Sequence, residues 1–100
     1  MSNLTILSKN NCVQCNSTYR ALGKRGVDAG NYSVINMDED PGALAFAQNT
    51  LGALQAPVVI FHEGTWEDVM NGPDLIETHW TGFRPDKVNW LAEQLTDVVA

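Results

Sequence analysis

Positive charge is scarce in this chain of 100 residues: six lysines and arginines stand against twelve aspartates and glutamates, for a net charge of −6. A domain that neutralises the phosphates of a nucleic acid, or that adheres to an anionic lipid surface, needs the opposite balance. The composition therefore argues against a protein that works by binding nucleic acid or membrane.

Long hydrophobic runs are also missing. The uncharged stretch from Pro41 to Phe61 contains Gln48, Gln55 and Pro57, so we do not expect it to cross a membrane. Residues 1–4 include no basic segment ahead of an apolar run, and no secretory signal is predicted. The expected compartment is the cytoplasm.

The remaining composition, with 44% hydrophobic and 18% charged residues, is that of an ordinary globular protein. The chain length corresponds to one domain, and we expect a single domain over residues 1–100. The two cysteines are then informative, because thiols in the cytoplasm stay reduced unless they serve chemistry or bind a metal.

Hydrophobic periodicity predicts an α/β fold in the order βαβαββα, a four-stranded mixed sheet with three helices. The first βαβ unit requires parallel strands and a right-handed crossover. The connection between the last two strands is long, and we expect it to be a hairpin or a loop with a short extra strand near Trp66. The predicted strands are 4–7, 32–35, 58–61 and 76–80, and the predicted helices are 12–25, 41–52 and 84–99, the last with an apolar face that includes Val99.

The sequence Cys12-Val13-Gln14-Cys15 lies where the first strand has ended and the first helix begins. A C-x-x-C at this place in a βαβ unit is typical of thioredoxin-like redox proteins. Unpaired backbone amides and the positive end of the helix dipole favour a thiolate at Cys12, whose pKa we expect to lie below that of a free thiol. Cys15 faces inward one turn later. We therefore predict Cys12 as the nucleophile and Cys15 as the resolving thiol.

Three other interpretations of the cysteine pair stay open at this point. The pair could form a structural disulfide, which a reducing cytoplasm would remove, or two unreactive thiols. A zinc site would need two further ligands, and only His62 and His79 are available, neither in a ligand-spaced pair. We interpret both histidines as exposed or packing residues and expect no metal.

Two motifs resemble those of a known family, the NrdH redoxins, which are glutaredoxin-like in sequence and thioredoxin-like in behaviour. The first is CVQC at Cys12–Cys15, continued by TYRAL at residues 18–22, and the second is WTGFRPDK at Trp80–Lys87, close to the family's W-S-G-F-R-P-D. The segment QAPVV at residues 55–59 matches as well. The resemblance spans nearly the whole chain and implies a thioredoxin-like fold.

The resemblance also implies further site residues. Pro57 would be cis and packed beside the cysteine pair, and the backbone of Ala56 would pair with a substrate segment. Lys9 would stabilise the thiolate, although a solvated lysine is an equal alternative. The other implied substrate-binding residues are Val13, Gln14, Trp80 and Phe83, of which the last two could instead be ordinary core residues.

Three departures from the family pattern bear on this site. Asn10 stands in place of a proline, which we expect to loosen the loop before Cys12. Thr81 replaces a serine and keeps its hydroxyl. The stretch from Ile60 to His79 is much longer than the tight turn of the family, so the surface near the site is expected to differ.

The function implied by the resemblance is reduction of protein disulfides, with ribonucleotide reductase as the substrate and NADPH-dependent thioredoxin reductase as the source of electrons. No bound cofactor is implied, and we expect a monomer. One alternative is a glutathione-dependent glutaredoxin, but the bulky Phe83-Arg84 pair stands where such proteins carry a Gly-Gly turn. Another is a redoxin-fold interaction module with incidental cysteines, for which the long stretch carrying Trp66 is the best support.

Overall fold

Four strands form one mixed sheet in the spatial order β2, β1, β3, β4. The computed structural model describes residues 2–96. Strand β1 (Ser2–Ser8) pairs in parallel with β2 (Ser33–Asn36) and antiparallel with β3 (Val58–Glu63), and β3 pairs antiparallel with β4 (Ile76–Thr81). The predicted mixed four-stranded sheet is thereby confirmed.

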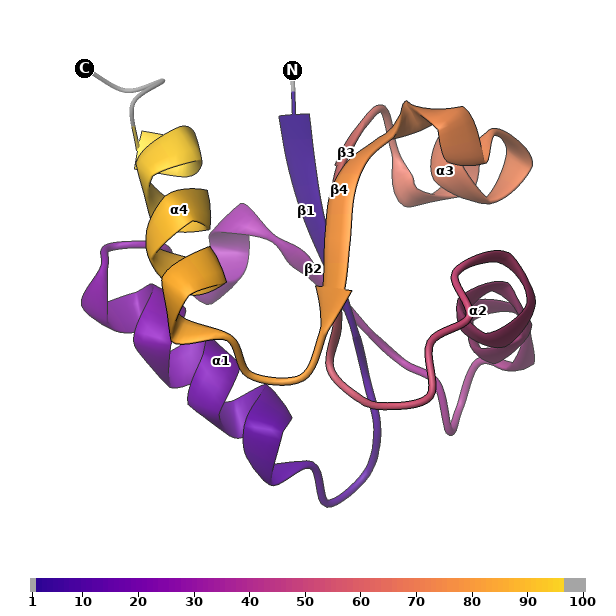
Figure 1. The fold of residues 1–100 in the computed structure, drawn as a ribbon, viewed down its shortest axis with the longest axis horizontal. Coiled ribbons are helices and arrows are strands. Elements are labelled where there is room, and N and C mark those ends of the chain that lie inside the picture. The colour runs from indigo at the N-terminus through magenta and orange to yellow at the C-terminus, as the bar shows by residue number, and fades with distance from the viewer. Residues whose placement is uncertain (1, 97–100) are drawn as a thin grey trace.

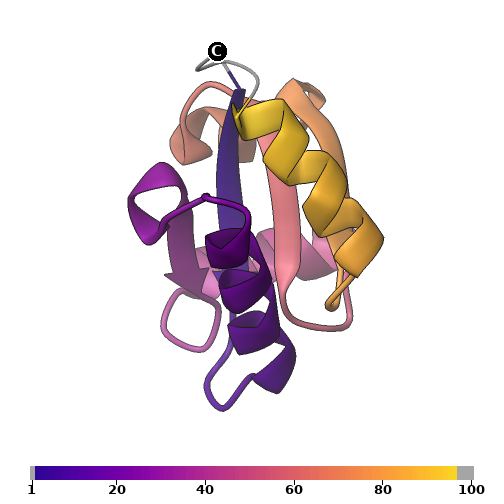
Figure 2. The same cartoon turned by 90° about the vertical axis from the view of Figure 1, so that its left-hand side faces the viewer.

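Helices cover both faces of this sheet (Figure 1). Helices α1 (Val13–Lys24) and α4 (Pro85–Thr96) lie against one face, and Figure 2 looks onto this pair. Helix α2 (Pro41–Ala45), continued by the π-helical segment η2 (Phe46–Thr50), lies on the other face with α3 (Trp66–Asn71). Two short 3₁₀ turns, η1 (Ala29–Asn31) and η3 (Pro73–Leu75), precede β2 and β4. No helix within residues 2–96 has the length and hydropathy needed to span a membrane.

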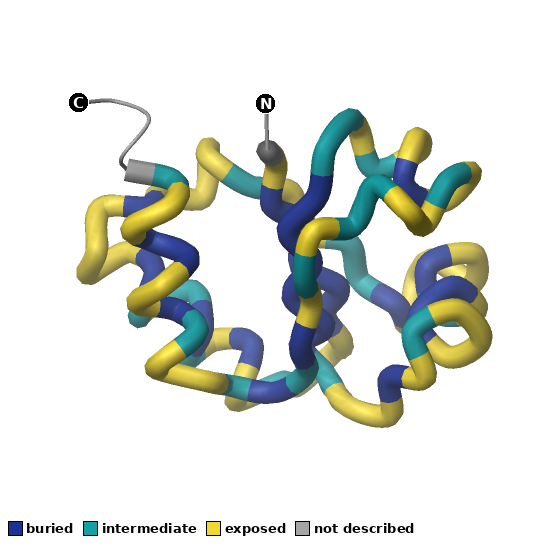
Figure 3. The backbone as a smooth tube through the Cα atoms, turned by 45° about the horizontal axis from the view of Figure 1, so that its top comes forward, coloured by how far each residue is buried: buried dark blue, intermediate teal, exposed yellow. Residues whose placement is uncertain are grey.

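The sheet separates two apolar layers because successive side chains of a strand point to opposite faces. Leu4, Ile6, Val59 and Phe61 point toward α1 and α4, and Leu7, Val58 and Ile60 point toward α2. In Figure 3 the buried stretches of the tube run through the middle of the molecule. Strands β1 and β3 are buried on both faces, and this explains their nearly continuous apolar sequences. The predicted face of the last helix is confirmed at Val88, Leu91 and Ala92, whereas Val99 lies outside the described residues.

Of the two forms expected for the long connection, the hairpin is confirmed, because β3 and β4 pair antiparallel. The count of three helices was wrong, because a helix and not a short strand lies at Trp66. This additional helix is α3, and it begins at a capping box. Thr65 Oγ1 accepts a hydrogen bond from Asp68 N, and Asp68 Oδ2 accepts one from Thr65 N. The ring of Trp66 packs edge-on against Phe46, with centroids 5.2 Å apart. This contact joins α3 to η2, and the side chain of Trp66 is half-buried.

The two histidines have different surroundings. His62 is fully buried: its Nε2 lies 2.8 Å from Thr5 Oγ1, and its Nδ1 lies 3.1 Å from the carbonyl oxygen of Glu63. Because a carbonyl accepts only, Nδ1 carries the proton and Nε2 accepts from Thr5. His79 is exposed on β4. The packing interpretation is thus confirmed for His62 and the exposed one for His79.

Candidate active site

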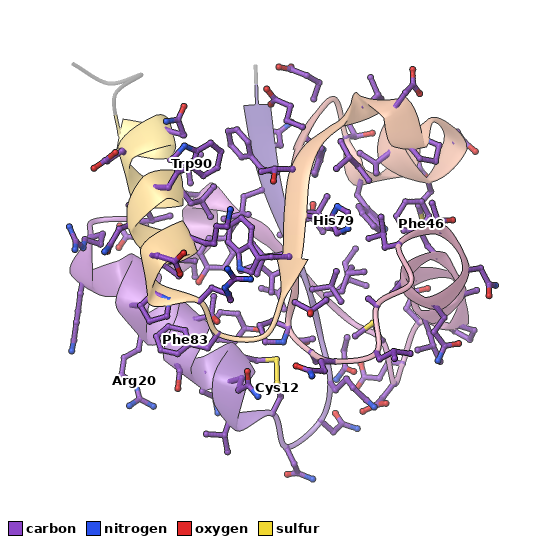
Figure 4. All side chains as sticks on the ribbon, viewed as in Figure 1. Cys12, Arg20, Phe46, His79, Phe83 and Trp90 are labelled. Atoms are coloured by element: carbon purple, nitrogen blue, oxygen red, sulfur yellow. A yellow bond between two sulfur atoms is a disulfide. The ribbon has the colours of Figure 1, made fainter. Side chains whose placement is uncertain are left out.

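Three chain segments meet at the end of the sheet where β1 and β4 finish: residues 9–12, the loop before β3, and the turn between β4 and α4. The Cys12–Cys15 disulfide lies here, in the lower part of Figure 4 beside the turn that carries Phe83. The Cα atoms of the two cysteines are 5.2 Å apart. The site is therefore built from loops at the edge of a rigid sheet.

Cys12 is the N-cap of α1, with an extended backbone. Its sulfur accepts a hydrogen bond from the amide of Cys15 at 3.1 Å. A helix N-terminus presents unpaired N–H groups and the positive end of the helix dipole, and both stabilise negative charge on a sulfur at this position. The local fold thus supplies the environment that the sequence predicted for Cys12.

The two sulfurs differ in access. Cys12 is half-buried, whereas Cys15 is only 2% exposed and faces inward from α1, as predicted. Cys12 is therefore the more accessible residue of the pair. The two cysteines thus differ in burial, and their roles as nucleophile and resolving thiol stay a prediction.

The loop before Cys12 is held in place. Asn10 N donates to Asp38 Oδ2, and Asn36 Nδ2 donates to Asn10 Oδ1, both at 2.8 Å. These two hydrogen bonds tie the loop to residues 36 and 38, and the expected loosening relative to a proline stays a prediction. Asn11, with φ of +53°, makes the turn into Cys12.

The loop before β3 contains a cis peptide bond between Ala56 and Pro57, as the resemblance implied. Pro57 is buried, and its carbonyl oxygen accepts from Gly82 N at 2.9 Å. Ala56 is half-buried. The loop and the β4–α4 turn are thus joined directly.

Gln14 joins the same turn to the cysteine motif. Its Oε1 accepts from the amide of Phe83 at 2.9 Å. Gly82 has φ of +78°, and a Cβ placed on it would lie 2.9 Å from Gln14 Oε1 and 3.4 Å from Gln55 Oε1. The sequence predicted Gln14 as a substrate-binding residue, but its carboxamide oxygen already has a partner within the chain.

The segments that meet at the site carry exposed apolar side chains. Val13 is 76% exposed and Leu54 is 93% exposed. Phe83 is half-buried against the core beneath α4. Trp80 is only 6% exposed and belongs to that core cluster, so its predicted contact with a substrate stays a prediction.

Lys9 is exposed and lines a small hollow of about 90 Å³ together with Leu44, Ala47 and Gln55. The residues that line this hollow do not include Cys12. The stabilisation of a Cys12 thiolate by Lys9 therefore stays a prediction.

Sequence reasoning did not assign roles to Leu54, Gln55 and Gly82. Gln55 and Gly82 belong to the QAPVV and WTGFRPDK motifs, which were the available signal. Leu54 lies just before the first of these motifs, and its exposure depends on the path of the loop, for which the sequence carries no local signal.

Comparison with known proteins places this geometry in a family. The glutaredoxin family model matches residues 4–65. The chain is 41% identical over 88 residues to the glutaredoxin-like protein NrdH of Escherichia coli, and the match covers 88% of this chain and 86% of that protein. It is 38% identical to the glutaredoxin-like protein NrdH of Salmonella typhimurium, with the same coverage of both chains.

Solved structures agree. The NrdH-redoxin of Escherichia coli, described as a glutaredoxin-like protein with a thioredoxin-like activity profile, matches with a TM-score of 0.65 and 39% identity over 89% of this chain and 93% of that one. A thioredoxin of Malassezia sympodialis matches with a TM-score of 0.62 at 15% identity, over 95% of this chain and 75% of that one, and shows the fold alone. With the cysteine pair at the start of α1 and the cis-proline loop beside it, the chain belongs to the glutaredoxin family, among its NrdH-type, glutaredoxin-like redox proteins.

Proposed function

We propose that this protein is a dithiol-disulfide oxidoreductase that reduces disulfides of other proteins. The observation that carries the proposal is the asymmetry of its cysteine pair: Cys12 is reachable at the N-terminus of α1, and Cys15 is buried one turn later. A structural disulfide needs no such asymmetry, whereas thiol-disulfide exchange uses one attacking and one resolving sulfur.

The reaction starts from the reduced pair. The Cys12 thiolate attacks one sulfur of the partner's disulfide, that S–S bond breaks, and the released partner thiolate takes up a proton. The Cys15 thiol then gives up its proton and attacks Cys12 Sγ, which frees the second partner sulfur as a thiol. Two electrons have moved: the partner is a dithiol and this chain carries the Cys12–Cys15 disulfide.

The surface around Cys12 supports a protein as the substrate. Val13 lies within the cysteine motif and Leu54 in the loop before the cis-proline, and both are exposed apolar side chains. We infer that they, with Phe83 and the backbone of Ala56, contact the segment that bears the target disulfide. Such exposed apolar groups favour burial against a partner. Lys9 and Trp80 are further candidates for this surface.

We propose ribonucleotide reductase as the substrate and thioredoxin reductase as the electron donor, in the cytoplasm, with the protein acting as a monomer without a bound cofactor. The family membership supports this choice, as does the thioredoxin-like activity profile described for the relative in Escherichia coli. Glutathione is a weaker donor candidate. Phe83 N–H already donates to Gln14, and Pro85 has no amide hydrogen to offer a carboxylate at the start of α4.

The experiment is NADPH oxidation during reduction of insulin disulfides by the purified protein. One arm supplies thioredoxin reductase, and the other supplies glutathione with glutathione reductase. We expect turnover at low micromolar protein in the first arm and much less in the second. Efficient turnover with glutathione and none with thioredoxin reductase would contradict the proposed donor. Cys12→Ser is the control and should be inactive. A wild type no more active than Cys12→Ser in either arm would make the protein an interaction module with incidental cysteines.

A further inference from the structure

Strand β4 forms an open edge of the sheet. In the part of the chain that the structure describes, it pairs with β3 alone. Figure 1 shows the sheet edge-on, with β4 nearest the viewer and no helix drawn in front of it. An edge strand presents a row of unpaired N–H and C=O groups and is a template for another strand.

The register identifies which groups point outward. Gly82 N donates to Pro57 O. Two and four residues earlier in the chain, Trp80 lies opposite Val59 and Thr78 lies opposite Phe61, so their backbone groups also face β3. Antiparallel strands alternate between residues whose backbone groups bond the neighbour and residues whose groups point away. The backbone N–H and C=O of His79 and Thr81 therefore point to the open side.

A hollow lies on each face of this edge. One, of about 260 Å³, is lined by Thr78, Trp80 and Trp90 with Asp86 and Lys87. The other, of about 480 Å³, is lined by residues 51–55 together with His79–Thr81 and Arg84. In Figure 4 the labelled Trp90 and His79 lie on opposite sides of β4. Consecutive side chains of an added strand point to opposite faces, so one would enter each hollow.

The two hollows differ in chemistry. The first is aromatic: Trp90 is exposed, and buried Trp80 has an indole N–H with no acceptor among the described residues. The second is lined by one cationic side chain, Arg84, and by no acidic one. Arg84 is exposed, and its Nε lies 3.9 Å from Asp86 Oδ1, a contact that holds it loosely. An apolar side chain suits the first hollow and an acidic side chain suits the second.

We propose that the β4 edge binds an extended segment of the protein whose disulfide is being reduced, as an added strand with an apolar side chain against Trp90 and an acidic one beside Arg84. This inference rests on the proposed function. The segment belongs to the disulfide-bearing partner because the second hollow ends at Gln55 and Thr81, next to the Gly82–Pro57 hydrogen bond beside the disulfide. A second copy of this chain fits less well, because two chains of net charge −6 repel each other.

The test uses synthetic peptides as substrates of the reduced protein. The first is a short cyclic disulfide peptide. Two others carry the same ring and an eight-residue flank of alternating leucine and aspartate, one on the N-terminal side of the ring and one on the C-terminal side. We expect kcat/KM to rise about ten-fold for one flanked peptide, the gain from roughly two additional net hydrogen bonds. Two further peptides carry N-methyl groups on alternate amides of the flank, one on the odd and one on the even positions. One of them loses the gain in kcat/KM and the other keeps it, because only alternate amides of an added strand face β4.

A variant of the protein probes the same edge. His79→Pro removes an outward N–H without removing a bond to β3, and the ratio of flanked to unflanked kcat/KM falls toward one. His79→Ala keeps this N–H and retains most of the gain. The ratio corrects for any general loss of activity in either variant.

Each remaining outcome overturns a defined claim. Equal rates for flanked and unflanked peptides overturn strand addition and leave the proposed function standing, whereas reduction of neither peptide overturns both. A gain that both methylated registers retain overturns pairing with the β4 edge. If the kcat/KM gain of the flanked peptide disappears at protein concentrations at which sedimentation detects dimers, a second copy of this chain occupies the edge.

Discussion

Gln14 and Phe83 lie 69 residues apart in the sequence, yet the side-chain oxygen of Gln14 accepts the backbone hydrogen bond of Phe83 at 2.9 Å. The neighbouring Gly82 donates in turn to Pro57. These two hydrogen bonds join the cysteine motif, the cis-proline loop and the β4–α4 turn into one unit. The shape of the surface around Cys12 therefore depends on a side chain inside the C-x-x-C motif.

Gln14→Ala removes the acceptor of the Phe83 amide. We expect it to lower the free energy of unfolding by about 1 kcal/mol, the net contribution of a typical hydrogen bond. It also lowers kcat/KM for insulin, because the turn that carries Phe83 is less restrained. Denaturant unfolding of the oxidised protein measures the first effect. Asn16→Ala, at an exposed position of the same helix, is the matched control, and an equal loss in both variants would contradict a specific role for Gln14.

Gly82→Ala tests the backbone of the same turn. With φ of +78°, the position favours glycine, and an alanine there costs about 1–2 kcal/mol. The contact of its Cβ with Gln14 Oε1 adds to this cost. Gly23→Ala, inside α1 with open space around the added Cβ, should instead stabilise the protein by about 0.5–1 kcal/mol. Both values come from denaturant unfolding, and an unchanged stability of Gly82→Ala would be inconsistent with the strained turn.

The buried pair of Thr5 and His62 is a third test. Thr5→Val leaves Nε2 of His62 without a partner in the core, and this should cost about 1–3 kcal/mol of unfolding free energy. Thr5→Ser keeps the hydroxyl and should cost clearly less. Thr5→Val keeps the methyl and loses only the hydroxyl, so equal losses in the two variants would contradict a specific role of this hydrogen bond.

The start of α3 should depend on pH through Asp68. The backbone amide of Thr65 donates to its carboxylate and lowers the pKa of Asp68 below the ordinary 3.8. The pKa of Asp68 is lower in the folded protein than in the unfolded chain. The carboxylate therefore stabilises the fold at pH values above the unfolded-state pKa, and this stabilisation is lost as the pH falls through the folded-state pKa. Asp68→Asn should therefore destabilise the protein at neutral pH, and the difference should vanish in acid. A difference that is constant across this range would exclude the carboxylate charge as its cause.

Much of the fold was predictable because its signals are local. Asp40-Pro41 marks the start of α2, where Asp40 Oδ1 accepts from Ala43 N, and the apolar run after Pro57 marks β3. The cysteine positions were predictable for the same reason, since a strand end followed by a helix start fixes both the N-cap and the inward face.

The parts that were not predicted depend on contacts distant in the sequence or on weak local patterns. Helix α3 did have a signal, the capping sequence Thr65-Trp66-Glu67-Asp68, but the helix is only six residues long and its stability depends on the packing of Trp66 against Phe46. The link from Gln14 to Phe83 has no local signal at all. The open edge of β4 depends on the order of the strands, which the pattern of one strand does not specify.

The most direct test of the central claim, that Cys12 attacks and Cys15 resolves, is the trapping of a mixed disulfide. The reduced Cys15→Ser variant is incubated with a disulfide-bonded protein such as insulin, and the covalent product is identified by mass spectrometry without reductant. We predict that Cys15→Ser accumulates a mixed disulfide through Cys12, and that Cys12→Ser forms none because its remaining thiol is buried. A mixed disulfide that forms through Cys15 in Cys12→Ser, and not through Cys12 in Cys15→Ser, would contradict the account.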